Sequence, residues 1–373
     1  MPKAAGATDM RRPALTVRAV RAVAVQLPMT HALGTSAAVV REAPLLLADL
    51  ETEEGVTGRA WQFCYTPAAA AAITHMLEDA VGAVRGDAVA PAALWDKLAK
   101  RYTLIGVQGI VRMAMAMVDV AAWDALAIAA KLPLASFLGA APRPIPAYNS
   151  CGLGLMAPAA VADEAEQLLA GGFRAMKLRL GYATLAEDLA AVRAVRKRLP
   201  DGIAIMTDYN QALTADEATA RGRALDGEGV YWIEEPIRHD DYAGCAKLAA
   251  AIHTPVQIGE NFSQVHDMEK ALAANACDYV MPDLERIGGV TGWQRAARLA
   301  QSAGFKMSSH LYPEVSAHLL AATPTAHWLE YVDWINAVVE EPLRIVDGHA
   351  VIPERPGNGL SWDEAAVRKY RMA

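Results

Sequence analysis

Short apolar runs recur along the chain from about residue 145 onward, and an alanine-rich stretch of helical character follows each run. This alternation is typical of parallel strands joined by crossover helices. One run and the helix after it take roughly 25 residues, which is the length of one βα unit. The pattern over residues 141–335 therefore predicts a (β/α) barrel. Its eight expected strands are Ile145–Asn149, Phe173–Arg179, Ile203–Asp208, Val230–Glu234, Pro255–Glu260, Cys277–Asp283, Phe305–His310 and His327–Glu330.

A different pattern precedes the barrel, over residues 15–140. Two apolar runs of strand type come first, and two long helical patterns follow after a turn at Glu54 and Gly55. This order predicts an α+β domain. Residues 1–14 are basic and have no apolar stretch behind them, which predicts a disordered tail and no secretory signal. The expected strands lie near Val17–Gln26 and Leu45–Glu51, and the expected helices near Ala68–Val84 and Gly109–Ala130.

The last segment, residues 336–373, contains the apolar run Ile345–Ile352, which Asp347 and Gly348 interrupt. Two short strands around such a turn are typical of a hairpin. We expect this hairpin to leave the barrel and the segment to pack back on the first domain.

Composition narrows the class of protein. A chain of 373 residues favours two domains, and 53% hydrophobic with 21% charged residues is typical of a soluble globular protein. The net charge of -7 argues against a nucleic-acid partner, and four widely separated cysteines favour reduced thiols in the cytoplasm. Asp119 and Asp124 interrupt the apolar stretch Met113–Ala130, which therefore predicts a buried helix and no membrane segment.

Acidic residues close several of the expected strands. Catalytic groups of barrels project from the carboxyl ends of strands, so Asp208, Glu234 and Glu260 should lie within a few ångströms of one another. Three crowded carboxylates need a divalent cation to offset their repulsion, and ligands that are all oxygen favour Mg²⁺ over zinc. Each carboxylate alone could instead cap a helix or pair with a surface arginine, but the three together predict one Mg²⁺ per subunit.

Two basic residues lie on one expected strand, close to the same end of the barrel. Lys177 and Arg179 are two positions apart, so both side chains should point to the same face. A neighbouring guanidinium should lower the pKa of Lys177, and a guanidinium itself makes a poor base. We therefore expect Lys177 to be the base on this side, with Arg179 beside it.

Opposite them, His310 closes the seventh expected strand behind Ser308 and Ser309. Asp283, one strand earlier, could bind the second ring nitrogen and fix the tautomer, which makes the pair a candidate acid or base. Glu330, when protonated, could donate a hydrogen bond to a substrate carboxylate; alternatively it pairs with Arg286. The set predicts removal of the proton next to the carboxylate of a 2-hydroxy acid through an ene-diolate.

These residues, taken with their neighbours, resemble the enolase superfamily and within it the mandelate racemase subgroup, from about Leu15 onward. The resemblance implies an enolase-like barrel of modified TIM type under an N-terminal capping domain. It implies that Asp208, Glu234 and Glu260 bind Mg²⁺, that Asp283 and His310 form the catalytic dyad, and that Glu330 supports the ene-diolate. The matching stretches include Asp208–Gln211, Trp232–Pro236, Gly259–Asn261, Met281–Asp283, Ile287–Trp293 and Met307–Glu330.

The same resemblance implies contacts to the substrate and an assembly. Asn210 and Ser150 would bind the substrate, and Tyr65 would lie near the same pocket. A mobile capping loop around 29–36, with Met29 and Leu33, would close over it. Members of the subgroup are commonly homo-oligomers, so an octamer is favoured here.

One departure from the subgroup bears on the reaction. Its members carry two lysines on the second strand, the second being a base toward one enantiomer, and Arg179 replaces that lysine here. We therefore expect dehydration of an acid sugar to a 2-keto-3-deoxy acid, with one base at C2 and His310 as the acid at C3. The alternative is a racemase or epimerase of mandelate or a related 2-hydroxy acid. A third possibility is a catalytically silent barrel, which the intact set of acidic residues disfavours.

Overall fold

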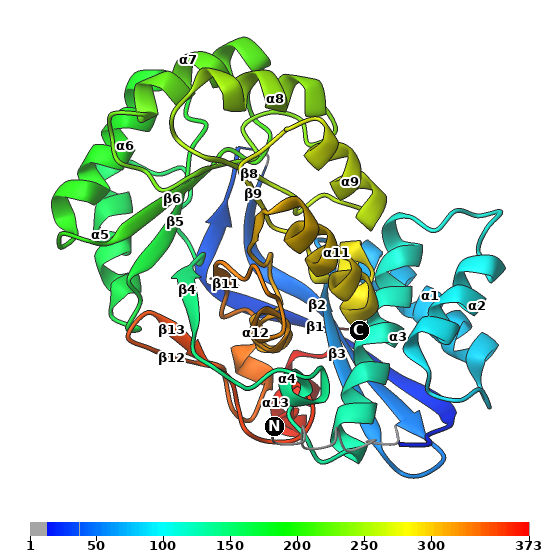
Figure 1. Cartoon of the computed structure of the whole chain (residues 1–373). Coiled ribbons are helices and arrows are strands. Elements are labelled where there is room, and N and C mark those ends of the chain that lie inside the picture. The colour runs from blue at the N-terminus through cyan, green and yellow to red at the C-terminus, as the bar shows by residue number, and fades with distance from the viewer. Residues whose placement is uncertain (1–12, 37, 373) are drawn as a thin grey trace, which may run out of the picture.

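The computed structural model describes residues 13–36 and 38–372, so most of the expected tail at 1–14 lies outside the described residues. The N-terminal part is an antiparallel sheet of order β1-β2-β3 with helices packed on one face (Figure 1). Its third strand, its second helix and its short fourth helix are absent from the sequence prediction, whereas the two expected strands and two expected helices are confirmed. The elements are β1 (Val17–Gly34), β2 (Val39–Thr52), β3 (Thr57–Phe63), α1 (Pro67–Val84), α2 (Pro91–Arg101), α3 (Gly109–Ala129) and α4 (Leu134–Phe137).

The first two strands form a hairpin that is longer than the sequence pattern predicts. β1 and β2 stay paired from Val17 opposite Thr52 to Gly34 opposite Val39, with an irregularity between Pro28 and Leu33. Residues 29–34 of the capping loop expected at 29–36 are therefore the end of a strand. Backbone pairing accommodates its polar residues because neither face at this end packs fully into a core.

The second part is a barrel of parallel strands, as predicted. The strands follow one another in chain order from β4 to β10, and β11 pairs with β4 on the other side. The barrel closes where Met307 bridges Ala326 and the His327 N–H donates to the Met307 carbonyl. The strands are β4 (Ile145–Asn149), β5 (Ala175–Arg179), β6 (Ala204–Asp208), β7 (Ile233–Glu234), β8 (Val256–Ile258), β9 (Tyr279–Val280), β10 (Lys306–Met307) and β11 (Leu329–Tyr331).

Helices connect these strands and surround the barrel (Figure 1). α6 and α7 each begin with a capping box, in which Thr184 or Thr214 exchanges hydrogen bonds with a glutamate three residues later. Such caps fix where a helix leaves the strand end that precedes it. The helices are α5 (Pro158–Leu169), α6 (Leu185–Arg198), α7 (Ala215–Leu225), α8 (Tyr242–Ala251), α9 (Val265–Ala273), α10 (Leu284–Ile287), α11 (Gly289–Ala303) and α12 (Pro313–Ala321).

The C-terminal segment touches both parts. After a 3₁₀ turn (Asn336–Val338), β12 (Arg344–Val346) and β13 (His349–Val351) form the expected hairpin. β13 pairs with β4, so the hairpin itself stays on the barrel and does not leave it as expected. The residues after it reach the capping sheet: Trp362 Nε1 donates to Asp49 Oδ1 at 2.7 Å, and helix α13 (Glu364–Tyr370) lies beside β1.

Helix α3 joins the two parts, which explains why it is buried on nearly all sides. Asp119 Oδ1 accepts the backbone N–H of Thr291 at 2.9 Å, at the start of α11. Asp124 accepts the N–H groups of Arg59 at 2.7 Å and Asn358 at 2.6 Å. The expected buried helix is confirmed, and no helix in the described part of the chain is both long and apolar enough to cross a bilayer.

Candidate active site

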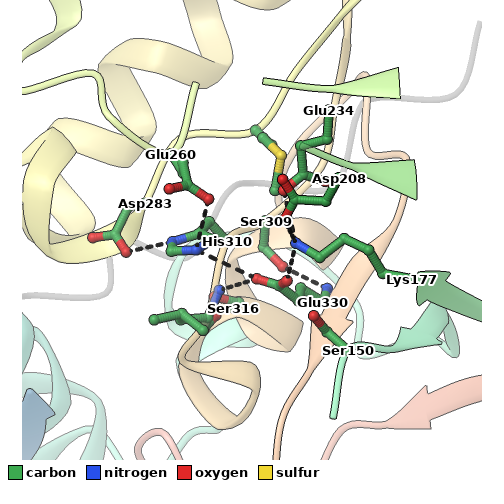
Figure 2. Close-up of polar contacts among 12 residues, drawn as sticks. Ser150, Lys177, Asp208, Glu234, Glu260, Asp283, Ser309, His310, Ser316 and Glu330 are labelled. Carbon is green, nitrogen blue, oxygen red and sulfur yellow. Dashed lines mark hydrogen bonds and ion pairs between the residues drawn. The ribbon is translucent and has the colours of Figure 1, made fainter. Parts of the chain in front are cut away.

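The polar residues that close the barrel strands meet at one mouth. Lys177 and Arg179 lie on β5, Asp208 ends β6 and Glu234 ends β7. Glu260 lies two residues after β8, Asp283 and His310 lie three residues after β9 and β10, and Glu330 lies on β11. Figure 2 shows Lys177 on one side of this group, His310 with Asp283 on the other, and Glu330 between them.

Asp208, Glu234 and Glu260 each offer an oxygen, and these oxygens all lie within 4.8 Å of one another. Asp208 and Glu234 are fully buried, and Glu260 is partly buried. Asp208 Oδ1 accepts the Asn210 N–H at 2.8 Å, and Glu234 Oε2 accepts Trp232 Nε1 at 3.2 Å, so both carboxylates have fixed orientations. Three convergent carboxylates fit a hard divalent cation such as Mg²⁺.

Lys177 is enclosed by carboxylates. Its Nζ lies 2.7 Å from Glu234 Oε1, 2.7 Å from Glu330 Oε1 and 3.2 Å from Asp208 Oδ2. Burial alone would lower the pKa of this amine, but the attraction of the three carboxylates outweighs it and raises the pKa well above its ordinary value. The prediction that Arg179 lowers the pKa of Lys177 is therefore wrong.

Arg179 turns to the backbone of the loop after β4. Its Nη1 donates to the Gly152 carbonyl at 2.7 Å, and its Nη2 to the Ser150 carbonyl at 3.2 Å and to Ser150 Oγ at 3.4 Å. Both Arg179 and Lys177 line the cavity described below, so their expected common face is confirmed. The hydrogen bonds of this guanidinium go to the loop and not to Lys177, whose pKa is set by Glu234, Glu330 and Asp208.

His310 and Asp283 form the expected pair. His310 Nδ1 lies 2.7 Å from Asp283 Oδ2, and His310 Nε2 lies 3.3 Å from Glu260 Oε2. Burial would lower the pKa of His310, but the charges of Glu260 and Glu330 and the hydrogen bond to Asp283 raise it to about 9. Asp283 Oδ1 accepts the N–H groups of Glu285 and Arg286, which fixes the carboxylate at the start of α10.

Glu330 is an ionised acceptor in this structure. Burial would raise its pKa, but Lys177 and His310 lower it to about 2, and its Oε2 accepts the Leu311 N–H at 2.8 Å. The expected protonated form is therefore wrong for this state of the site. The alternative pair with Arg286 is wrong as well, because Arg286 donates to the Glu260 carbonyl, to Asn261 Oδ1 and to the Tyr65 hydroxyl.

A cavity of about 340 Å³ lies over these groups, between the barrel mouth and the β1–β2 hairpin. Four of the expected substrate contacts line it, namely Leu33, Tyr65, Ser150 and Asn210. Met29 is not among the described residues that line it; its partly buried side chain packs against the hydrophobic core instead. Phe63 and Trp334, whose rings pack with centroids 4.6 Å apart, give one wall an apolar surface.

Several residues of the site escape the sequence prediction. Asn261 Nδ2 donates to both oxygens of Glu235, at 3.0 and 2.8 Å, and to Glu260 Oε1 at 3.2 Å. Asn261 and Gln211 also line the cavity. The acidic doublet Glu234–Glu235 and the position of Asn261 directly after Glu260 are the signals that could have found this group. Phe63 carries no such signal, because it ends a capping strand far from the barrel strands in the sequence. Trp334 lies three residues after β11, but an apolar ring does not distinguish a cavity wall from the core.

Comparison with protein families gives two matches that together span most of the chain. Residues 15–139 match the family described as "Mandelate racemase / muconate lactonizing enzyme, N-terminal domain". Residues 160–366 match the family described as "Enolase C-terminal domain-like". The division falls where the capping sheet and its helices end and the barrel begins.

Individual relatives agree. L-talarate/galactarate dehydratase of Salmonella typhimurium is 32% identical over 328 residues, which cover 88% of this chain and 82% of the relative. An enolase of alpha proteobacterium bal199 with bound magnesium is 43% identical, with a TM-score of 0.94 over 96% of this chain and 100% of the other. A Bradyrhizobium enolase complexed with magnesium and mandelic acid is 39% identical, with a TM-score of 0.91 over 97% and 99%. Other relatives include further acid-sugar dehydratases and cycloisomerases.

Proposed function

Since the chain belongs to the mandelate racemase and muconate lactonizing enzyme family of the enolase superfamily, we propose that it removes the proton next to the carboxylate of a 2-hydroxy acid through an ene-diolate. The preferred reaction is dehydration of an acid sugar to a 2-keto-3-deoxy acid. One observation carries the proposal: three carboxylates within 4.8 Å of one another lie beside a histidine that a buried aspartate orients.

The three carboxylates of Asp208, Glu234 and Glu260 would hold Mg²⁺. When bound, the cation would neutralise the substrate carboxylate and so make the neighbouring C–H bond more acidic. Lys177 adds a fixed positive charge beside two of the same carboxylates, with its Nζ 2.7 Å from Glu234 Oε1 and 3.2 Å from Asp208 Oδ2. Asn210 and Ser150 lie in the cavity wall, where an amide and a hydroxyl could orient the substrate hydroxyls.

His310 is the group best placed to move a proton. Its Nδ1 is held by Asp283, so Nε2 is the nitrogen that can exchange a proton with a substrate in the cavity. In dehydration, His310 Nε2 takes the proton from C2 as the C2–H bond breaks, and it then gives that proton to the C3 hydroxyl, which leaves as water when the C3–O bond breaks. The resulting enol loses its O–H proton to solvent, takes up a proton at C3 and becomes the 2-keto-3-deoxy acid. Lys177 is occupied by three carboxylates and Arg179 by loop carbonyls, which supports a reaction that uses His310 alone.

The test is proton NMR of the purified enzyme with magnesium in deuterium oxide, offered a panel of aldonic and aldaric acids. The expected result is a 2-keto-3-deoxy acid from one of them, and no product from the His310→Asn variant. Arg295→Gln, an exposed change on α11 that does not touch the cavity, is the matched control and should keep full activity. A panel in which wild type and His310→Asn give the same spectra would contradict the proposal.

Racemisation of mandelate or a related acid is the second candidate. Leu33, Phe63 and Trp334 give the cavity an apolar wall that suits an aryl or alkyl group better than a sugar chain, and a relative is complexed with mandelic acid. Both enantiomers of mandelate therefore belong in the same NMR experiment. Change of configuration together with deuterium at C2 would establish the racemase, with Lys177 standing in for the missing second base.

The assembly is proposed from the family alone. We expect a homo-oligomer, with an octamer favoured. Light scattering of the purified protein measures the mass directly, and a mass of one or two chains would contradict the octamer.

A further inference from the structure

The loop between β4 and α5 contains two consecutive residues with left-handed backbone. Gly152 has φ 58° and Leu153 has φ 49°. A leucine in this conformation is uncommon, so the loop needs contacts from outside itself to hold its shape. Residues 150–154, called the seat loop below, receive such contacts on two opposite sides.

Arg179 holds the seat loop from inside the barrel. Its Nη1 and Nη2 donate to the carbonyls of Gly152 and Ser150, at 2.7 and 3.2 Å, and its backbone N–H donates to the Leu153 carbonyl at 3.0 Å. The side chain is only 4% exposed, so water competes little for these hydrogen bonds. A guanidinium can bind two carbonyls from one rigid fork, whereas a lysine at this position would offer a single nitrogen.

A second pair holds the seat loop from outside the barrel. His31 on β1 places its Nδ1 2.7 Å from Oε1 of Glu164 on α5. Gly152 lies between the two side chains: a Cβ on Gly152 would overlap the Glu164 carboxylate and lie 2.9 Å from the His31 Cβ. Only glycine fits here, so the pair from hairpin and helix closes directly over the loop.

The hairpin that His31 belongs to also rests on the seat loop. Gly34 and Gly154 pack backbone to backbone, since a Cβ on Gly154 would lie 2.7 Å from the Gly34 Cα. Leu33 and Thr35, on either side of Gly34, line the cavity over the carboxylates. The position of this cavity wall therefore depends on the position of the seat loop.

From these contacts we infer that the seat loop is clamped between Arg179 on one side and the His31–Glu164 pair on the other, and that the clamp positions the hairpin over the active site. Arg179 is then a positioning residue, which explains why an arginine occupies the place of a base. The kinetic consequence rests on the proposed function, because it needs a substrate that the hairpin covers. The structural consequence does not.

Hydrogen–deuterium exchange of the full chain tests the clamp without any substrate. Glu164→Ala removes the outer contact and Arg179→Lys removes the inner fork. Both should speed amide exchange in peptides covering 29–36 by at least about threefold, because the hairpin end loses part of its support. Glu228→Ala is the control and should leave this exchange unchanged; it breaks the 2.6 Å pair between Arg193 on α6 and Glu228 in the turn after α7. Unchanged exchange at 29–36 in either Glu164→Ala or Arg179→Lys overturns the inference.

Steady-state kinetics distinguish a clamp that positions the hairpin over the substrate from a contact that only stabilises the fold. With the acid that wild type turns over, Glu164→Ala should raise KM by about threefold or more and change kcat by less than about twofold, since Glu164 lies outside the cavity and the chemical groups are untouched. If kcat instead falls by about threefold or more while KM stays unchanged, the positioning role is contradicted. If wild type turns over no acid in the panel, the proposed function fails, while the exchange experiment still decides the clamp.

Discussion

At the scale of single residues, Asp283 has two tasks for its two oxygens. Oδ1 accepts two backbone N–H groups at the start of α10, and Oδ2 faces His310 Nδ1 at 2.7 Å. In Asp283→Asn, the amide oxygen would keep the helix cap, so the amide NH₂ would face His310. Nδ1 would then accept a hydrogen bond from this NH₂, and the ring hydrogen would sit on Nε2. We expect C2 deuterium exchange to fall by about 10² to 10⁴ with the fold intact, because His310 can no longer take a proton at Nε2. Circular dichroism checks that the fold is intact, and NMR in deuterium oxide measures the rate of C2 exchange.

Lys177 and Glu330 show what can be predicted for a residue and what cannot. The spacing of Lys177 and Arg179 predicts their common face correctly, because alternation along a strand is a local property. The pKa of Lys177 depends instead on Glu234, Asp208 and Glu330, which arrive from three other strands. A sequence shows that these carboxylates exist but not which of them lies nearest to the amine. The sign of the predicted pKa shift was wrong for that reason.

At the scale of elements, the barrel strands were predictable because each is a short apolar run closed by a polar residue and followed by a helix. The capping elements were harder. β3 contains Gly58, Arg59 and Gln62, and it is held as a strand by its pairing with β2 and its packing against α3. The end of β1 likewise owes its strand form to β2, so propensity within 29–34 gives no sign of it.

Asp124 on α3 allows a test of how much the hydrogen bonds from this helix to the backbone of β3 and of the C-terminal segment contribute to stability. Its oxygens accept the N–H groups of Arg59 and Asn358, and an asparagine would place an NH₂ against one of them. We expect Asp124→Asn to lower the free energy of unfolding at pH 5 by about 1 to 3 kcal/mol, measured with urea. Asp201→Asn, at an exposed turn, is the control and should change it by less than about 0.5 kcal/mol.

The pH dependence of that difference follows from burial. Burial raises the pKa of Asp124 to about 7, although the two N–H groups oppose the shift. Because the folded pKa lies above the unfolded value of 3.8, the contribution to stability is fully present below about pH 4 and is lost as the pH rises through 7. The deficit of Asp124→Asn should therefore shrink between pH 5 and pH 8. A deficit that grows over this range would contradict a raised pKa.

At the scale of the whole molecule, the two domains meet at the active site and are held together away from it. The cavity takes its floor from barrel strand ends and its roof from the β1–β2 hairpin. Asp119, Asp124 and Trp362 tie the capping sheet and α3 to the barrel and to the C-terminal segment at some distance from that cavity. The hairpin end over the cavity is supported elsewhere, at the seat loop, where Gly154 packs against Gly34.

The buried charges at the barrel mouth couple metal binding to the stability of the whole molecule. Lys177 is the cation within 3.2 Å of Asp208 and Glu234, so Lys177→Met leaves buried carboxylates unpaired. Without magnesium we expect the free energy of unfolding to fall by about 3 to 5 kcal/mol. Magnesium binds the folded state and supplies charge to the same carboxylates, and it should bind Lys177→Met more tightly than wild type because no ammonium competes for these oxygens. At one magnesium concentration the variant therefore gains more stability, and the deficit should shrink.

Urea unfolding of wild type and Lys177→Met, each with EDTA and with saturating magnesium, gives the four free energies needed. Lys97→Met breaks an exposed pair, with Nζ 2.6 Å from Asp87, and should cost at most about 1 kcal/mol with or without the metal. A deficit in Lys177→Met that is the same in both conditions would mean that magnesium does not act on the carboxylates that Lys177 touches. A smaller deficit in the free energy of unfolding with magnesium would show that the ammonium of Lys177 and the metal act on the same carboxylate oxygens.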